Sequence, residues 1–493
     1  MNNQTIFQFF HWYYSAEGNL WVHAKDQAPH LASLGVTQVW LPPAYKSAKG
    51  TDEPGYAVYD LYDLGEFDQK GSVRTRWGTV AEYLECIRVF HEHNIKVLAD
   101  IVLNHKIGAD EREKIWVLNV NEHNRTEFTS EPYEVEAYTK FTFPGRNGKY
   151  SAFIWDHNCF TGICENDKIT MIKNDYFTGQ WEAVPENEYG NYDYLMGNDI
   201  EYRNQQVREE LKNWGVWYAE KASLDGFRLD AVKHITPDFF PEWLDHLNRH
   251  FNKQFLCIGE YWKSDIAPLR DYIQATNGRI QLFDAPLHFN FHEASVQGES
   301  YDLSHILDHS LTAERPELSI TFVDNHDTQP LQSLQSPVEP WFRPLAYAII
   351  LLREQGTPCV FYPSIYGAQY VDNASGQEQF IDLPALSCVA TMMKVRKNLA
   401  YGLQKDYLDH PSTIGWTREG TGEKDNSGCA VVIANGQEGA KRMNMGKQHA
   451  GRKMIECCGH RNEQITLDEN GEADFPVNGG SVSVWIFEGA SLD

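Results

Sequence analysis

The chain is poor in basic residues for its size. Its 493 residues include 43 Lys and Arg against 69 Asp and Glu, which gives a formal net charge of -26 at pH 7. Binding to a nucleic-acid backbone requires clustered Lys and Arg that displace counterions, so this composition argues against a nucleic-acid partner. A neutral or cationic ligand fits the charge better.

The sequence also lacks long apolar runs and targeting signals. The longest aliphatic run, "LAYAIILL" at 345–352, falls far short of the roughly 20 apolar residues that cross a bilayer. The N-terminal "MNNQTIFQFFHWYY" has no basic leader, apolar core or small-residue cleavage site. These features predict a cytoplasmic protein without a membrane partner.

The nine cysteines show neither the pairing of a disulfide framework nor the spacing of a metal site. Their number is odd, Cys457 and Cys458 are neighbours, and no pair of C-x-x-C motifs occurs. We expect free thiols, as is usual in the cytoplasm. If a bridge does form, the short separation of Cys159 and Cys164 makes them the first pair to examine.

Strand patterns alternate with helical patterns along most of the chain. β-branched and aromatic runs predict eight strands, which begin at Thr5, Val36, Lys96, Asp225, Phe255, Arg279, Ser319 and Pro358. Helical spacing follows each strand; Val207, Leu211 and Trp214, for example, fall on one helix face. Eight such units predict an α/β fold of the (β/α)8 TIM-barrel type.

Two regions break this alternation. The stretch from His105 to about Asn204 is rich in Asn, Asp, Gly, Tyr and Trp without helical spacing, and predicts an irregular β insertion after the third strand. After about Tyr401, short strands such as "CAVVIAN" and "SVSVWIFE" predict a C-terminal antiparallel β domain. The predicted division is a barrel from 1–104 and 205–399, an inserted β subdomain at 105–204 and a C-terminal β domain at 400–493.

Ionisable side chains gather at the predicted carboxyl ends of four barrel strands, where TIM barrels carry their chemistry. They are Asp100, Asn104 and His105 after the third strand, Arg228, Asp230, Lys233 and His234 after the fourth, Glu260 after the fifth, and His326 and Asp327 after the seventh. So many ionisable groups on one rim indicate a functional site rather than separate structural ion pairs.

Several carboxylates on one rim are compatible with two chemistries, divalent-metal binding as in enolase-like barrels or glycoside cleavage by an acid and a nucleophile. Arg228 favours the second, because a neighbouring cation keeps Asp230 ionised as a nucleophile whereas a metal cluster gains nothing from it. The aromatic side chains near strand ends are Trp12, Trp40, Tyr56, Tyr62 and Trp262. We single out Tyr56 and Trp262 as flat apolar faces for sugar rings.

Four segments resemble the signature regions of the alpha-amylase family of glycoside hydrolases, in the same order and spacing. They are "DIVLNH" (100–105), "GFRLDAVKH" (226–234), "GEYW" (259–262) and "FVDNHD" (322–327). "WLPPAYK", "GYAVYDLYDLGEF" and "VNGGSVSVW" extend the likeness to nearly the whole chain. Within the family, the chain is similar to the bacterial liquefying-type enzymes and to the leaderless cytoplasmic ones of enteric bacteria.

The resemblance implies a role for each carboxylate on the rim. Asp230 would be the nucleophile, and Glu260 would be the general acid/base. Asp327 would be the third carboxylate, which holds sugar hydroxyls and favours ring distortion in the transition state. Asp100 would support the site without reacting.

The resemblance also implies a set of substrate-binding residues. They would be Tyr56, His105, Arg228, Lys233, His234, Trp262 and His326. Arg228 would orient Asp230 and keep it ionised. Tyr56 would stack on the sugar in the cleaved subsite, and Lys233 would reach toward the leaving side.

A structural calcium site between the insertion and the barrel is a further implication of the resemblance. Its ligands would be Asn104, Asp193, Asp199 and the backbone carbonyl of His234, an oxygen-only set that suits Ca²⁺. A second cation near Asp156, Glu182 and Glu201 is a further expectation, although two of these three are glutamates where relatives carry aspartates.

The sequence therefore predicts a monomeric retaining enzyme that hydrolyses α-1,4-glucosidic bonds within starch, glycogen or maltodextrins by double displacement. A maltogenic or transglycosylating member of the same family is the first alternative, since loops on the acceptor side distinguish them. A noncatalytic glucan-binding homologue is disfavoured, because such proteins typically lose catalytic carboxylates and Asp230, Glu260 and Asp327 are all present.

Overall fold

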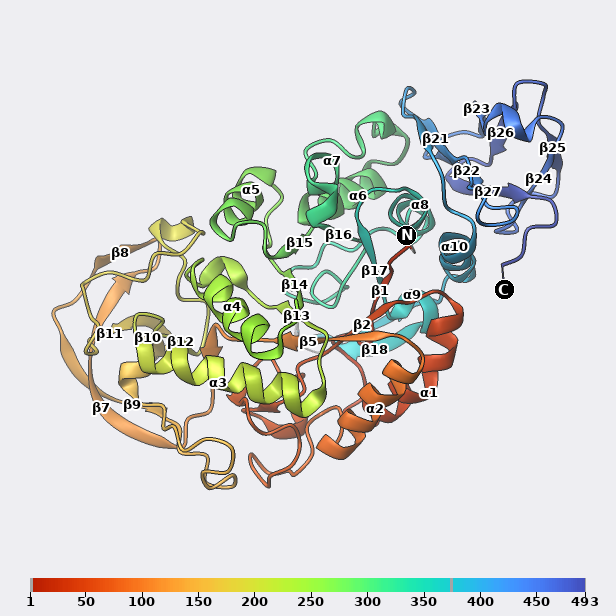
Figure 1. The fold of residues 1–493 in the computed structure, drawn as a ribbon. Coiled ribbons are helices and arrows are strands. Elements are labelled where there is room, and N and C mark those ends of the chain that lie inside the picture. Colours follow the sequence, from red (N-terminus) through yellow and green to blue (C-terminus); the bar gives the residue numbers. More distant parts are fainter. Residues whose placement is uncertain (1–2, 373–375, 493) are drawn as a thin grey trace.

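Eight parallel strands form a closed barrel in the computed structural model, which describes residues 3–372 and 376–492 (Figure 1). In barrel order they are β1 (Ile6–Gln8), β2 (Gln38–Leu41), β5 (Lys96–Ile101), β13 (Gly226–Leu229), β14 (Leu256–Gly259), β15 (Gln281–Phe283), β16 (Ser319–Phe322) and β17 (Thr357–Phe361). The last strand pairs with the first, with Cys359 opposite Ile6. The predicted barrel and all eight of its strands are confirmed.

Helices surround this barrel. They are α1 (Leu20–Ser33), α2 (Val80–Glu92), α3 (Gln205–Ala222), α4 (Phe239–Phe251), α5 (Ile266–Ala275), α6 (Ala285–Gln297), α7 (Leu311–Glu314), α8 (Arg343–Leu352), α9 (Pro363–Tyr366) and α10 (Ser387–Asn398). A capping box of Thr79 and Glu82 starts α2. The aliphatic run at 345–352 is buried in α8. No helix among the described residues is long and apolar enough to cross a membrane.

The segment between β5 and α3 folds into a sheet of its own, on the side of the barrel away from the C-terminal sheets (Figure 1). Its strands are β6 (His105–Lys106), β7 (Glu111–Asn121), β8 (Asn124–Phe128), β9 (Tyr133–Lys140), β10 (Phe160–Glu165), β11 (Lys168–Ile172) and β12 (Asn198–Ile200). This insertion is more regular than its sequence predicts, because the long ribbon of β7 and β9 exposes charged side chains on one face.

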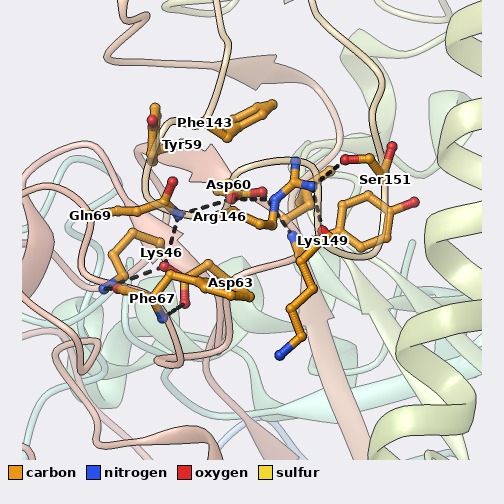
Figure 2. Close-up of polar contacts among 12 residues, drawn as sticks. Lys46, Tyr59, Asp60, Asp63, Phe67, Gln69, Phe143, Arg146, Lys149 and Ser151 are labelled. Carbon is orange, nitrogen blue, oxygen red and sulfur yellow. Dashed lines mark hydrogen bonds and ion pairs between the residues drawn. The ribbon is translucent and has the colours of Figure 1, made fainter.

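A buried polar cluster joins the insertion to the barrel (Figure 2). Arg146 of the insertion donates its Nε–H to Asp60 at 2.9 Å, and Gln69 bridges Asp60 and Asp63 with bonds of 2.9 and 3.0 Å. Lys46 lies 3.5 Å from Asp63 and also donates to backbone carbonyls. Because every charge in this cluster has an opposite partner, the cluster can hold the insertion in place without an uncompensated buried ion.

The C-terminal residues form antiparallel sheets, as predicted. Their strands are β20 (Gln404–Tyr407), β21 (Thr413–Arg418), β22 (Cys429–Ala434), β23 (Gly439–Asn444), β24 (Lys453–Glu456), β25 (Gln464–Thr466), β26 (Glu472–Val477) and β27 (Ser481–Phe487). Two strand pairs near the barrel complete the fold, β3 (Lys46–Ser47) with β4 (Val58–Asp60) and β18 (Ala368–Asp372) with β19 (Gln379–Leu383).

Candidate active site

Asp230 follows directly on the end of β13, at the rim of the barrel. Its N–H still donates to the Ile101 carbonyl of the neighbouring strand at 3.0 Å, which fixes its backbone. Side chains two residues apart in a strand point to the same side, so Arg228 and Asp230 point the same way. Nη1 of Arg228 donates to the Asp230 carboxylate at 2.5 Å.

One guanidinium contacts three carboxylates at this rim. Besides Asp230, Arg228 donates to Asp100 at 2.9 Å, and its Nη2 lies 2.9 Å from Oε2 of Glu260. Arg228 is 1% exposed, so these contacts lie in a low-dielectric environment. The ends of β5, β13 and β14 therefore meet at Arg228, as their positions in the sequence predict.

Asp100 is held from a second direction by aromatic donors. Its other oxygen accepts from the Tyr56 hydroxyl at 2.7 Å and from Nε1 of Trp40 at 3.0 Å. Trp40 is buried and belongs to the barrel core. Asp100 thus supports Arg228 and Tyr56 from beneath the site.

The carboxylates of this cluster carry more negative charge than Arg228 can balance. Burial raises the pKa of Asp230 well above its usual range, although Arg228 acts to lower it and Glu260 raises it further. Burial, together with repulsion by Glu260, raises the pKa of Asp327 to about 8. Arg228 therefore acts on Asp230 in the predicted direction, but its charge is shared, and the cluster favours keeping a proton near neutral pH.

His326 lies between Asp327 and the first strand of the barrel. Its Nε2 is 3.3 Å from the Asp327 carboxylate, and its Nδ1 is 3.1 Å from Nε2 of Gln8. The ring stacks on Tyr56 with 5.2 Å between centroids, and Tyr56 stacks in turn on Trp12 at 5.5 Å. Burial lowers the pKa of His326 well below its usual range, which leaves a neutral imidazole.

A cavity of about 280 Å³ opens above these residues. The three predicted catalytic carboxylates line it, as do the predicted binding residues Tyr56, His105, Lys233, His234 and Trp262. Arg228 and His326 are buried behind this lining. Nε2 of His105 lies 2.9 Å from the Tyr56 carbonyl, and burial lowers the pKa of His105 to about 4.

Seven further lining residues are not assigned from the sequence. They are Trp12, Tyr192, Leu195, Met196, Ala231, Ser333 and Leu334. A signal existed for Trp12, which lies near a strand end, and for Tyr192 and Met196, which lie in the "NYDYLMGND" segment. Leu334 follows β16 in a loop without any motif, so nothing in the sequence indicates its position.

Two of the predicted calcium ligands, Asn104 and Asp199, lie where β12 pairs with β6, and Asp193 lies in the loop before β12. Asn104, Asp193 and Asp199 are each at most 3% exposed. Nδ2 of Asn104 is 3.4 Å from Asp199, while its Oδ1 is buried with no hydrogen-bond partner among the described residues. Burial raises the pKa of Asp193 to about 7 and that of Asp199 well above its usual range. An unpartnered amide oxygen beside buried carboxylates fits a hard cation.

The contacts at His234, the fourth predicted ligand, and the side chains near it do not by themselves make a complete calcium site. Nδ1 of the His234 ring lies 2.6 Å from the Tyr192 carbonyl, which fixes the backbone beside the cavity. Within the described ranges, no three His, Cys, Asp or Glu side chains form a ready metal-binding group. A cation here would therefore depend on the Asn104 amide and on backbone oxygens as well as on carboxylates.

The residues expected around a second cation are engaged with protein groups. Arg203 donates to both oxygens of Glu201 at 2.6 and 2.7 Å, and Asn174 adds a bond of 3.0 Å. Asp156 accepts from the N–H of Asn158 at 2.8 Å, and Glu182 accepts from a backbone N–H. A second cation beside Glu201 would have to displace the Arg203 guanidinium.

Comparisons with known proteins agree with this geometry. A family model described as the catalytic domain of alpha amylase matches residues 24–390. The cytoplasmic alpha-amylase of Escherichia coli strain K12 is 47% identical over 99% of both chains, and a glucan 1,4-alpha-maltohexaosidase of Bacillus sp. strain 707 is 42% identical over 98% of this chain and 92% of its own. The fold is similar to that of a Geobacillus thermoleovorans alpha-amylase crystallised with acarbose, with a TM-score of 0.64, 17% identity and 99% coverage of both chains.

Proposed function

Since the chain belongs to the alpha-amylase family, we propose that it hydrolyses α-1,4-glucosidic bonds within starch, glycogen or maltodextrins, with Asp230 as nucleophile, Glu260 as acid/base and Asp327 as third carboxylate. The observation that carries this assignment is the contact of one guanidinium, Arg228, with both Asp230 and Glu260 at the cavity. Such a contact holds two carboxylates close together, as double displacement requires.

The first displacement breaks the glucosidic bond. Ionised Asp230 attacks the anomeric carbon while Glu260 gives its proton to the leaving oxygen, so the leaving chain departs as an alcohol and a glycosyl ester forms on Asp230. Arg228 orients both carboxylates during the step.

The second displacement restores the enzyme. Glu260, now ionised, takes a proton from water, and the resulting nucleophile attacks the anomeric carbon from the side that the leaving chain has vacated. Asp230 leaves as a carboxylate. Two inversions at one carbon give net retention of the α-configuration.

The remaining lining residues would bind the sugar at the cleaved bond. The neutral His105 ring lines the cavity and can exchange hydrogen bonds with hydroxyl groups without an added charge, while the neutral His326 ring lies behind the lining and stacks on Tyr56. Tyr56 and Trp262 present flat apolar faces to the cavity. When Asp327 is ionised, its carboxylate would accept hydrogen bonds from sugar hydroxyl groups.

Asn104, Asp193, Asp199 and the His234 carbonyl would hold one calcium ion in this proposal. The unpartnered Asn104 oxygen and the buried carboxylates support it. Bound there, the ion would supply positive charge that offsets those carboxylates and would tie the insertion to the rim. It would take no part in bond cleavage.

We propose that the chain is a monomer in the cytoplasm. Its only partner would be the α-glucan substrate. The E. coli relative, which matches over 99% of both chains, is named a cytoplasmic alpha-amylase. The net charge of -26 gives no support to a nucleic-acid partner.

The product profile on long amylose and the anomeric form of the products test the function. We expect a broad ladder of lengths at early times and initial α-anomer by proton NMR. Initial β-anomer would contradict double displacement. A single early product would favour a product-specific type of action such as the maltogenic alternative, and products longer than the substrate would show the transglycosylating alternative.

A further inference from the structure

Glu186 of the insertion connects two loops of the site from behind the cavity wall. Its side chain is buried, with 5% of its surface exposed. Oε1 accepts N–H bonds from Asn187 and Glu188 at 3.1 and 3.2 Å, which fixes the local loop. Oε2 lies 3.0 Å from Nζ of Lys263 and 3.8 Å from Nζ of Lys233.

Lys233 is the member of this group that faces the cavity. Its Nζ donates to the Trp262 carbonyl at 3.2 Å and lies 5.6 Å from the centre of the Tyr192 ring. An ammonium group has three N–H donors. The carbonyl takes one and the Glu186 carboxylate attracts a second, so the third is left for a sugar hydroxyl in the cavity that Lys233 lines.

Under the proposed function, on which this inference rests, Glu260 protonates the leaving oxygen. Trp262 and Lys263 follow Glu260 along the chain, and Lys233 donates to the Trp262 carbonyl. The departing sugar would therefore lie next to Lys233, and these contacts would lie on the leaving-group side of the cavity. Without the Glu186 charge, Lys233 and Lys263 would repel each other and Lys233 would lose one of its two anchors.

We propose that Glu186 is a positioning residue for the leaving half of the α-glucan. By holding Lys233 against the Trp262 carbonyl, it determines how tightly the leaving half is bound and thereby which bond of a chain is cut. The backbone supports the same arrangement, because the Glu186 N–H donates to the Lys233 carbonyl at 3.3 Å.

Glu186→Gln keeps the shape of the side chain and removes its charge. On maltoheptaose labelled at the reducing end, KM should rise about fivefold, the value expected when one hydrogen bond to a charged group weakens, while kcat stays within about twofold. The preferred bond of cleavage should shift. On an aryl maltotrioside, which puts no sugar on the leaving side, kcat/KM should stay within about twofold.

Glu188→Gln is the matched control. Glu188 lies on the same loop and 3.6 Å from Lys263, so its loss should leave KM for maltoheptaose within about twofold of wild type. Glu186 and Glu188 both contact Lys263. Equal increases in KM for the two variants would therefore show that the effect arises through Lys263, which would overturn the proposal. An unchanged KM in Glu186→Gln would also overturn it.

A double-mutant cycle with Lys233→Met separates this inference from the function on which it rests. If Glu186 acts through Lys233, adding Glu186→Gln to Lys233→Met should raise KM no further; a full further increase would overturn the inference alone. Unchanged maltoheptaose binding in Lys233→Met would instead overturn the assignment of Lys233. Glu186→Asp, which keeps the charge, should recover most of the wild-type KM.

Discussion

The chemistry of the site depends on how one buried guanidinium is shared. Arg228 contacts Asp100, Asp230 and Glu260, and each contact limits the charge available to the others. Removing Asp100 would therefore affect catalysis as well as packing, although Asp100 does not line the cavity. Roles at this site are best separated by substitutions that keep side-chain shape.

Asp230→Asn and Glu260→Gln should differ on substrates with different leaving groups. Asp230→Asn removes the proposed nucleophile and should lower kcat at least roughly 10⁴-fold on every substrate. Glu260→Gln should lose about 10²- to 10⁴-fold on amylose, whose leaving oxygen needs a proton, and much less on an aryl maltotrioside. Steady-state kinetics on both substrates, with folding checked by circular dichroism, measures this; equal losses on the aryl substrate would contradict the assignment.

Asp327 should make stability fall as pH rises. Its pKa is raised to about 8, so the folded state holds a proton that the unfolded state has released, and each pH unit between the two pKa values weakens folding by up to about 1.4 kcal/mol. Asp327→Asn removes this loss. Its melting temperature should fall less than that of wild type from about pH 6 to about pH 8.

The control for Asp327 is a carboxylate that stays in water. Asp26 has a side chain that is 62% exposed, and Asp26→Asn should follow the wild-type melting curve at every pH. Parallel curves for wild type and Asp327→Asn would show that Asp327 is ionised throughout this range.

At the scale of elements, the pairing of β6 with β12 connects the insertion to the rim next to the proposed calcium site. A calcium ion that binds only the folded chain would add roughly 2.7 kcal/mol at 100 times its dissociation constant. Chelation should therefore lower the melting temperature, and Asp199→Ala should make it insensitive to added calcium. Differential scanning calorimetry with and without chelator measures both effects.

Two variants sharpen the calcium experiment. Asp175→Ala, at an exposed position on the insertion, should keep the calcium response of wild type. Glu260→Gln should keep it too while losing activity, since the proposed ion would take no part in bond cleavage. Identical melting of chelated and calcium-loaded wild type would show that the proposed site is wrong.

The ion pair of Arg146 and Asp60 should be the strongest single link between insertion and barrel. Both side chains are at most 2% exposed, so Arg146→Met leaves a buried carboxylate with less compensation and should cost about 3–5 kcal/mol of unfolding free energy. Denaturant unfolding measures this. Arg112→Met, at an exposed position of β7, should change stability by less than about 0.5 kcal/mol.

The double variant Asp60→Asn with Arg146→Met tests whether charge is the cause. Removing both charges should cost less than the sum of the two single changes, because neither is then left buried alone. Strict additivity would assign the loss to packing.

For the whole molecule, the nine cysteines should all react as thiols. Each is free in the structure, and Cys159 is buried while Cys164 is exposed. Titration after anaerobic denaturation without reductant should count nine. A count of seven or fewer would show a disulfide, and peptide mapping would identify it.

Much of the barrel and its rim could be predicted because both follow from local pattern. The buried strands appear in the sequence as runs of β-branched residues. Asp230, Glu260 and Asp327 each follow one of these strands within a few residues. The buried pair of Arg146 and Asp60 could not be predicted, because the partners are 86 residues apart and no spacing rule joins them. Glu186 was missed for the same reason, since its partners Lys233 and Lys263 lie in other elements.

Closure of the barrel by its first and last strands has a consequence for synthesis on the ribosome. β1 cannot pair with β17, nor Gln8 with His326, until those distant segments have emerged, on the order of 20 to 70 seconds after β1 at typical rates of translation. During that interval the apolar β1 has an open edge and must be kept from premature pairing. The nascent chain therefore cannot cut glucan while it is being made, and the enzyme becomes active only when its synthesis is nearly complete.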